Sequence, residues 1–312
     1  MTHEARALII TVNARTSECA LQFLQSISRL EGFAHCYVLV VDNHSSDGSV
    51  ARIRQAISGF ANVELLEAPR NLGYFGAAKL GHQHYLESHR APDWVIISND
   101  DIVFDEPLFL AKLFQKDPTA MGMLAPAIIS ALTHHDANPS VRRRPSRLRM
   151  LQYQLWLSNY YAMWFKQWLS PYVRRVRFRF YNRTPRLGEG VSRPIYAPHG
   201  AFLIFSRKFF EAGGFIDTDF FLYAEEFIVA EMCLRLGLPV IHDPELRVWH
   251  KEGRTLGTML TRSSHMYQQN GFRYVLNRYK NSYPELGPPR VAKSPTGEAR
   301  TSPTPATGER VR

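Results

Sequence analysis

The first third of the chain alternates between short apolar runs and amphipathic stretches, and no other feature constrains the fold as strongly. Apolar runs typical of strands lie at residues 6–12, 36–42, 62–67 and 93–99. Helical patterns lie between them, at residues 16–30, 48–58 and 74–88. A repeated strand and helix order implies crossover connections, so it predicts a mainly parallel central sheet flanked by helices.

After the first third the pattern continues and then changes. Residues 107–116 indicate a further helix and residues 121–129 a further strand. A basic and aromatic insert follows at 131–193, before strand and helix signals return at 194–286 and complete the same fold. From residue 287 to 312 the chain is rich in Pro, Ser, Thr, Gly and charged residues with almost nothing to bury, which predicts a disordered tail.

The composition bounds the class of protein. With 312 residues and 45% hydrophobic content, the chain can build a substantial core. Its 38 basic and 28 acidic residues leave a formal charge of +10, which favours anionic partners such as phosphates, nucleic acid or acidic lipid. Cys19, Cys36 and Cys233 have no paired spacing, so neither a disulfide framework nor a zinc site is indicated and a reducing compartment fits best.

The N-terminal residues bear on location. The chain enters a strand pattern almost at once, without the basic start and apolar core of a signal peptide. No stretch reaches the roughly 20 apolar residues that spanning a bilayer requires. We therefore expect a cytoplasmic protein, with a peripheral position on the inner face of the membrane as the alternative.

Adjacent acids end the apolar run that begins at Trp94. Asn99, Asp100 and Asp101 follow the Val- and Ile-rich residues typical of a buried parallel strand. Ligands of open α/β sheets bind at the carboxyl ends of such strands, and carboxylate oxygens suit Mg²⁺ or Mn²⁺. The run therefore predicts a metal-held diphosphate. The alternative is that Asp100 caps a turn and Asp101 is solvated.

Two polar loops precede the helices at 48–58 and 74–88. Asp42 ends the second strand, where its carboxylate can bind a nucleobase or ribose, and the turn after it offers backbone N–H groups; alternatively Ser46 or Asp47 is a simple N-cap. Arg70 precedes a glycine-rich helix entry and can face a phosphate. The glycine spacing does not match a dinucleotide fingerprint.

A second pair of acids begins a helical pattern. Glu225 and Glu226 precede the apolar residues of an amphipathic helix, where they complement the helix dipole in a purely structural role. As a functional alternative, a carboxylate at this position is expected to stay ionised and to act as a general base. His250 ends a later apolar strand, either as a structural residue or as a further metal ligand.

Taken in order, these motifs resemble the family 2 glycosyltransferases, especially the bacterial rhamnosyltransferase-like branch that extends cell-surface polysaccharides. The resemblance covers about residues 6–255. It rests on Val-Asp-Asn-x-Ser-x-Asp-Gly-Ser at 41–49, Asn-Leu-Gly-x-x-Gly at 71–76, Asn-Asp-Asp at 99–101, His-Gly-Ala at 199–201, Gly-Gly-Phe-Ile-Asp at 213–217, Phe-Phe-Leu-Tyr-Ala-Glu-Glu at 220–226 and Trp-His at 249–250.

The resemblance implies an α/β fold of the GT-A type and a role for each motif. Residues 1–130 would form the nucleotide-sugar-binding half and residues 194–286 the acceptor and catalytic half. Asp101 and His250 would bind the metal, and Glu226 would align with the catalytic Asp of the family, with Glu225 as the other candidate base. The donor would contact Thr11, Asn13, Asp42, Asn43, Arg70, Asn71, Gly73, Asn99 and Asp100.

This chain departs from the family pattern at two positions. The first acid of the Asp-x-Asp pair is Asn99, so metal affinity would rest on Asp101 with Asp100 assisting. Glu-Glu at 225–226 replaces Glu-Asp, which leaves the base open between the two.

The implied activity is inverting, metal-dependent sugar transfer from a nucleotide diphosphate donor to a glycan or lipid-linked acceptor. Thymidine diphosphate rhamnose is the first expectation for the donor and uridine diphosphate sugars are the next. The alternatives are a sugar-phosphate nucleotidyltransferase and a non-enzymatic adaptor that binds nucleic acid or membrane. The ordered acids argue against nucleic acid as the partner.

Two arginine clusters, the first at residues 142–149 and the second at 174–179, flank an aromatic stretch within the insert. As one helix, residues 148–169 would keep only a narrow polar stripe of Gln152, Asn159 and Lys166. Trp and Tyr rings beside arginines suit the interface of an acidic membrane. Packing against the catalytic domain or a second subunit remains the alternative.

Overall fold

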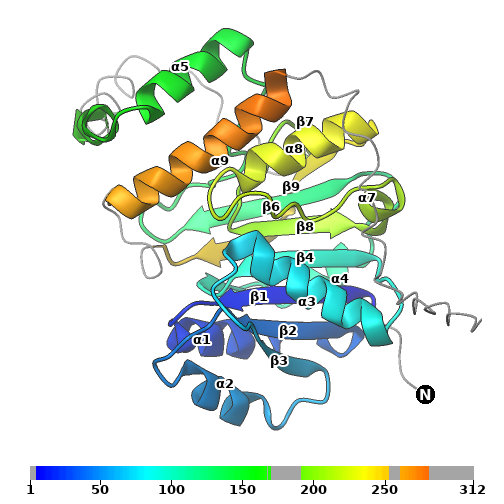
Figure 1. Cartoon of the computed structure of the whole chain (residues 1–312). Coiled ribbons are helices and arrows are strands. Elements are labelled where there is room, and N and C mark those ends of the chain that lie inside the picture. Colours follow the sequence, from blue (N-terminus) through cyan, green and yellow to red (C-terminus); the bar gives the residue numbers. More distant parts are fainter. Residues whose placement is uncertain (1–4, 167, 170–190, 253–260, 281–312) are drawn as a thin grey trace, which may run out of the picture.

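The computed structural model describes residues 5–166, 168–169, 191–252 and 261–280 (Figure 1). The predicted tail at 287–312 and the second arginine cluster of the insert lie outside them. The strands of this part are β1 (Ala7–Asn13), β2 (Cys36–Asp42), β3 (Val63–Glu67), β4 (Trp94–Asn99), β5 (Ile102–Val103), β6 (Met123–Ser130), β7 (Arg193–Ile195), β8 (Phe202–Ser206) and β9 (Val240–His250). All belong to one sheet, in the order β3-β2-β1-β4-β8-β6-β9-β5 with β7 beside β9.

The first four strands form the parallel half that the alternating pattern predicts. β1 pairs in parallel with both β2 and β4, and β2 with β3. The register sets Asn13 beside Asp42 and Val12 beside Asn99, so the carboxyl ends of β1, β2 and β4 meet at one edge. Strand order reverses between β1 and β4, which is where open α/β sheets bind ligands.

The later strands extend the same sheet. β8 runs antiparallel to β4 and β6, while β9 runs parallel to β6 and antiparallel to β5. The pairing of β5 with β9 sets Ile102 opposite His250. As a result, His250 lies next to Asp100 and Asp101, although these acids precede it by about 150 residues in the chain.

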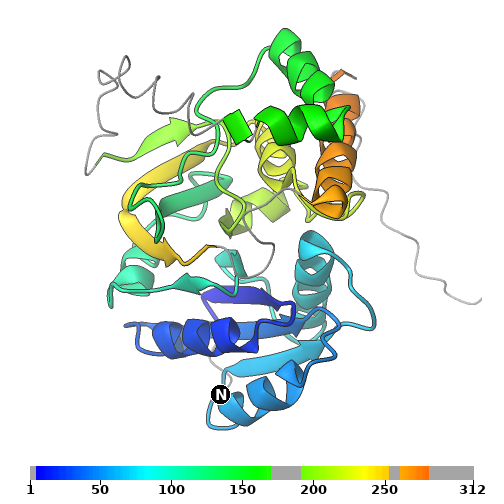
Figure 2. The same cartoon turned by 90° about the vertical axis from the view of Figure 1, so that its left-hand side faces the viewer.

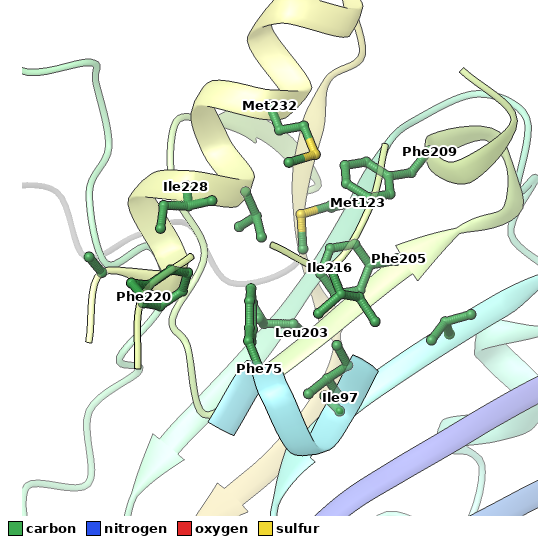
Figure 3. Packing of buried hydrophobic residues seen from close by; sticks show 14 of the residues in the cluster. Phe75, Ile97, Met123, Leu203, Phe205, Phe209, Ile216, Phe220, Ile228 and Met232 are labelled. Carbon is green, nitrogen blue, oxygen red and sulfur yellow. The ribbon is translucent and has the colours of Figure 1, made fainter. Parts of the chain in front are cut away.

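Helices cover both faces of the sheet. One face carries α1 (Ser17–Ile27), α2 (Ser49–Ile57) and α4 (Phe109–Leu113), and the other carries α3 (Tyr74–Ser88), α7 (Arg207–Glu211), α8 (Glu225–Leu236) and α9 (Arg262–Lys280). Alternate residues of β1 supply the two cores: Ile9 packs with α1 and Ile10 with α3. Figure 3 shows Ile228 and Met232 of α8 facing Phe75 of α3 and side chains of the sheet.

The insert is not the continuous helix that its apolar pattern predicts. Helix α5 (Arg147–Leu157) ends, and the helix resumes at Tyr160. The Ser158 hydroxyl donates to the Leu155 carbonyl, and Asn159 Oδ1 accepts from the backbone N–H groups of Tyr161 and Ala162. Ser and Asn side chains satisfy backbone groups at helix ends, so these two residues stop one helix and cap the next.

One side of the insert packs against the main body. In both views α5 lies beside α9, at the end of the molecule opposite α2 (Figure 1 and Figure 2). Met150 and Leu157 are buried, and Tyr153 packs edge-on to Phe272 of α9. Gln269 of α9 donates a 3.1 Å hydrogen bond to the Leu157 carbonyl. Packing against the catalytic body, one of the two alternatives, therefore accounts for this side.

The other side of the insert is exposed. Its exposed large apolar residues are Leu148, Leu151, Leu155, Trp156, Tyr161, Trp164, Phe165, Trp168 and Leu169, which we call the insert face. No helix in the described part of the chain combines the length and apolar character needed to cross a membrane.

The first arginine cluster divides between solvent and core. Arg142, Arg143 and Arg144 are all exposed, but the Arg144 guanidinium also reaches inward and forms a two-pronged ion pair with the buried Glu231 of α8, at 2.7 and 2.6 Å. The Tyr196 hydroxyl donates to the same carboxylate. A buried carboxylate needs such partners, so Arg144 anchors the start of the insert.

Candidate active site

A cavity of about 680 Å³ opens at the carboxyl edge of the sheet. Its walls come from the ends of β1, β4 and β9, the loops before α2, α3 and β8, the start of α8, and Tyr267 of α9. Of the residues singled out in the sequence, it brings together Asn43, Asn71, Asn99, Asp100, Glu225, Glu226 and His250. These residues come from segments far apart in the chain, so only the completed sheet assembles them.

Asp101 and His250 meet as the β5–β9 pairing requires. The His250 Nε2 atom lies 3.2 Å from Asp101 Oδ1, and both residues are buried. Among the described residues, Asp101 Oδ1 and His250 Nδ1 have no well-formed hydrogen bond. Leaving the buried Asp101 Oδ1 without a well-formed hydrogen bond is costly, which indicates that another group belongs beside this atom and His250 Nε2.

This donor pair fits a divalent cation. Neighbouring ligands on a cation with bonds of about 2.1 Å lie about 3 Å apart, close to the observed separation. Across the described residues, no three or more His, Cys, Asp or Glu side chains form a complete cage. Mg²⁺ is typically held by one or two carboxylates plus substrate phosphates, so the incomplete set is suited to binding a metal together with a diphosphate.

Asp100 points to a different partner. Its Oδ2 atom accepts a hydrogen bond from the Thr16 hydroxyl at the start of α1. Burial, reinforced by the neighbouring Asp101, raises the pKa of Asp100 to about 7. The alternative prediction made Asp100 a turn cap and Asp101 a solvated acid, whereas both residues are buried and Asp100 lines the cavity next to Asn99.

Asp42 holds the loop between β2 and α2. Its Oδ1 atom accepts from Asn13 Nδ2 at 2.6 Å and its Oδ2 atom accepts from the Ser45 backbone N–H at 2.8 Å. Asp42 and Asn13 are both buried and lie behind the cavity wall, while Asn43 and His44 line it. Thr11 is fully buried within β1, away from the cavity wall.

Asn43 and Asn71 connect the two polar loops. Asn43 donates to Asn71 Oδ1 at 3.0 Å and accepts from the Leu72 N–H at 2.8 Å. Gly73 has a φ of +75°, and a Cβ there would lie 2.0 Å from the Phe221 carbonyl oxygen. Gly73 is therefore required where the chain passes under the loop before α8, which is a structural role.

The basic residue on the cavity is Arg15 and not the predicted Arg70. Arg70 is exposed and lies outside the cavity wall, whereas Arg15 lines it just after β1. Arg15 has a φ of +64°, and its backbone N–H donates to Ser45. The left-handed backbone of Arg15 is unusual for a non-glycine residue and marks it in the structure. This backbone angle could not be read from the sequence, so Arg15 was not predicted.

Glu225 and Glu226 begin α8 at the cavity wall. Burial, and then the nearby Glu226, raises the pKa of Glu225 to about 8, and burial also raises the pKa of Glu226. For Glu225, the expectation that the helix N-terminus keeps the acid ionised does not hold at neutral pH, because desolvation outweighs the dipole. Glu225 Oε1 accepts from the Tyr223 N–H at 3.1 Å, whereas Glu226 is only half-buried and faces the cavity.

His199 is a site residue that the sequence analysis quoted only within a motif. Its Nδ1 atom accepts from the Ala201 N–H at 3.2 Å, which leaves Nε2 to carry the proton. Burial, and then repulsion from His250, lowers the pKa of His199 to about 4, so the ring is neutral. The rings of His199 and His250 lie 5.8 Å apart, and His199 therefore offers an N–H donor beside the candidate metal ligands.

The backbone just before α8 is strained. Tyr223 and Ala224 have φ values of +66° and +84°. Two successive non-glycine residues in this region cost of order 1–3 kcal/mol each and persist where the surrounding structure holds them, often at functional sites. Here they turn the chain so that Tyr223, Glu225 and Glu226 all reach the cavity wall.

Comparison with known proteins agrees with this geometry. A model of glycosyl transferase family 2 matches residues 7–169. Two relatives from two strains of Mycobacterium tuberculosis share the name N-acetylglucosaminyl-diphospho-decaprenol L-rhamnosyltransferase. Each is 27% identical over 228 residues, which cover 70% of this chain and 68% of the relative.

Solved structures share the fold. The mannosyltransferase PcManGT from Pyrobaculum calidifontis, in complex with GDP-Man and Mn²⁺, matches 82% of this chain with a TM-score of 0.50 and 17% identity. GalNAc-T7 with UDP, GalNAc and Mn²⁺ matches 87% of it with a TM-score of 0.56 and 11% identity. This chain spans 59% and 48% of the lengths of those chains. The α/β fold of the GT-A type is confirmed.

Proposed function

The chain belongs to glycosyl transferase family 2, and from that premise we propose that it is a metal-dependent inverting enzyme. It transfers a sugar from a nucleoside diphosphate to a hydroxyl group of a glycan or lipid-linked acceptor. One observation carries the proposal: a single cavity is lined both by the polar residues that end β4 and by Glu226 at the start of α8. Sugar transfer requires both a site for the donor diphosphate and a base for the acceptor hydroxyl.

The donor nucleotide occupies the cavity side formed by the loops after β1 and β2. Asn43 and Asn71 are held by each other there, and Arg15 supplies a cation for the diphosphate. Asp42 supports the loop from behind the cavity wall through its bonds to Asn13 and Ser45, so that Asn43 and His44 face the base.

Asp101 and His250 would hold Mg²⁺ or Mn²⁺, with Asn99 and Asp100 beside them. Such a cation offsets the negative charge that develops on the departing diphosphate. The neutral His199 can donate an Nε2–H hydrogen bond to the same phosphates.

Glu226 is the general base. It takes the proton of the acceptor hydroxyl while that oxygen attacks the anomeric carbon, and the bond from that carbon to the diphosphate oxygen breaks. A single displacement inverts the anomeric configuration. Glu225, which is buried and bonded to the Tyr223 N–H, positions the start of α8.

The transferred sugar is rhamnose, and the donor is thymidine diphosphate rhamnose. The name of the Mycobacterium tuberculosis relatives supports an L-rhamnosyl group and a lipid diphosphate acceptor that carries N-acetylglucosamine. Their 27% identity extends over 70% of this chain. The two other predicted functions, a nucleotidyltransferase and a non-enzymatic adaptor, are not favoured, because neither accounts for the family match.

The test is a donor panel. The purified chain is incubated with thymidine, uridine and guanosine diphosphate sugars and with an octyl diphosphate of N-acetylglucosamine, and nucleoside diphosphate release is measured. We expect release with thymidine diphosphate rhamnose that needs Mn²⁺ or Mg²⁺, stops with a chelator and is largely lost in Asp101→Ala. Full release in chelator, or no release from any donor, contradicts the proposal.

A matched pair of variants tests the base. Glu226→Gln keeps size and hydrogen bonding but cannot accept the proton, so kcat should fall by about two to four orders of magnitude while donor affinity changes little. Glu225→Gln is the control and should retain most of the activity. If the two variants exchange these effects, Glu225 is the base.

A further inference from the structure

A second cavity, of about 360 Å³, lies between the insert and helices α8 and α9. Tyr223 and Glu226 belong to the walls of both cavities. Because Glu226 lines both spaces, a ligand in the second cavity can bring a hydroxyl group to the same carboxylate that faces a ligand in the first.

We propose that this second cavity binds the acceptor, a sugar linked through phosphate to an apolar carrier. The proposal rests on the proposed function, because it assigns the donor to the first cavity. It gives the insert a role in substrate recognition, with Trp156 and Lys166 as the residues that recognise the acceptor.

The walls of the second cavity suit a sugar ring. Tyr153 and Trp156 come from α5, Phe227 from α8 and Phe272 from α9. Aromatic faces pack against the C–H faces of sugars, while Ser140 and Gln268 supply hydrogen-bonding groups in the same wall. Trp156 is 44% exposed, so its ring both lines the cavity and belongs to the insert face outside it.

Lys166 supplies a cation for phosphate. Its Nζ atom lies 5.6 Å from the ring centroid of Tyr153 and 5.7 Å from that of Trp156. In the described part of the chain, no carboxylate forms an ion pair with Lys166. A cation held between aromatic rings at a cavity wall, without an acidic partner, is available to an anionic ligand.

The exposed side of α5 supplies the apolar surface that a lipid carrier needs. Leu148, Leu151 and Leu155 are exposed on α5, the helix that also contributes Trp156 to the cavity. The apolar surface, the Lys166 cation, the aromatic cavity and Glu226 together match the apolar carrier, phosphate, sugar ring and attacking hydroxyl of one amphiphilic acceptor.

The first experiment compares two tryptophans of the insert. Trp156 and Trp164 are each 44% exposed, but only Trp156 lines the cavity. With the octyl diphosphate of N-acetylglucosamine as the soluble acceptor, Trp156→Ala should raise its KM about ten-fold and leave the KM for the donor unchanged. Trp164→Ala should leave both unchanged. An unchanged acceptor KM in Trp156→Ala, or an equal rise in both variants, overturns the proposal.

The second experiment separates sugar recognition from phosphate recognition. Lys166→Gln should weaken the octyl diphosphate probe about ten-fold and leave the octyl glycoside, which has no phosphate, unchanged. Equal weakening of both probes, or of neither, overturns the role of Lys166.

Direct binding keeps this proposal distinct from the proposed function. The octyl diphosphate probe is titrated into the protein without donor, by calorimetry, and folding of each variant is checked by thermal unfolding. Binding that is lost in Trp156→Ala supports the acceptor site even where no sugar transfer is observed. Equal binding by the wild type and Trp156→Ala overturns the site even where transfer is observed.

Discussion

At the residue scale, the acids of α8 show burial outweighing local helix electrostatics. A helix N-terminus favours a carboxylate by typically 0.3–1 kcal/mol, whereas taking that carboxylate out of water costs several times more. The pKa of Glu225 accordingly rises to about 8. The neighbouring Glu226 shares the penalty and is raised as well. A base with a raised pKa is a stronger proton acceptor, which suits the role given to Glu226.

The raised pKa of Glu225 predicts how the stability of the folded protein changes with pH. Its ordinary value is 4.5 and its folded value is about 8, so the folded protein retains a proton that the unfolded chain releases between these values. The favourable contribution is fully present below the lower value and is lost as pH rises toward the higher one. Glu225→Gln cannot titrate, so its melting temperature relative to the wild type should increase as pH rises from about 5 to about 8.5.

Thermal unfolding of both proteins across this pH range measures the difference. Titrations of groups that do not interact with Glu225 affect both proteins alike and cancel in the comparison. A difference that stays constant with pH would show that Glu225 is ionised in the folded protein.

Several individual site residues were predictable and others were not. Asp101, His250 and Glu226 stand at the ends of clear apolar patterns; His250 and Glu226 line the cavity, and Asp101 lies beside His250. Arg15 and His199 reach the same cavity from loops, where no periodic pattern exists. Arg70 has the right chemistry but lies outside the wall, because side-chain direction in a loop depends on tertiary contacts.

At the element scale, the loop before α8 depends on α9. Gly271 of α9 packs so closely that a Cβ would lie 2.3 Å from the Tyr223 carbonyl oxygen and 3.2 Å from that of Leu222. α9 was not foreseen in the sequence analysis, yet it supports the strained residues that present Glu226. The glycine inside this helix therefore has a packing reason.

Gly271→Ala should destabilise the protein. Helix propensity alone would favour alanine by about 1 kcal/mol, but overpacking against backbone atoms costs about 1–3 kcal/mol and forces α9 away from the loop. We expect a lower urea midpoint with an unchanged slope, together with reduced sugar transfer. Gly59→Ala is the control, because a Cβ there meets nothing within 4 Å. An equal or higher midpoint in Gly271→Ala would contradict the close contact.

The break in the insert is also decided at this scale. A mainly apolar pattern continues through residues 148–169, but Ser158 and Asn159 satisfy the backbone groups that a continuous helix would use. Capping residues were visible in the sequence. Their effect was missed because the apolar pattern around them was given more weight.

At the scale of the whole molecule, the insert joins two environments. Its inner side packs on α9. Its outer side is the insert face, and the same segment carries the exposed Arg142 and Arg143. Apolar and aromatic side chains beside arginines are typical of protein surfaces that meet acidic lipid. A carrier-linked acceptor would reside in such a surface.

We therefore predict salt-sensitive binding to acidic liposomes. Each arginine near the surface contributes about 1 kcal/mol, so Arg142→Gln with Arg143→Gln should weaken co-sedimentation by roughly thirty-fold at low salt. The control is Arg52→Gln with Arg54→Gln on α2, at the opposite end of the molecule (Figure 1). Equal binding to neutral liposomes, or equal loss in the control, would exclude an acidic lipid surface as the partner of this face.

By itself, the sequence determined the local elements and their chemistry. Continuous apolar runs placed β1 to β4, and period-3.6 patterns placed α1 to α3, within a few residues. A buried parallel strand is covered on both faces and a surface helix on one, so each pattern reflects the burial of a short segment. The ends of these elements carried the acids of the site.

Only the tertiary structure decided which of those ends meet. The pairing of β5 with β9 joins Asp101 to His250, and the packing of the insert on α9 creates a second cavity beside Glu226. Such contacts link residues separated by a hundred positions or more, and local periodicity contains no information about them. Burial in that assembled site then shifts the acids of α8 away from the ionised state that the helix start alone would favour.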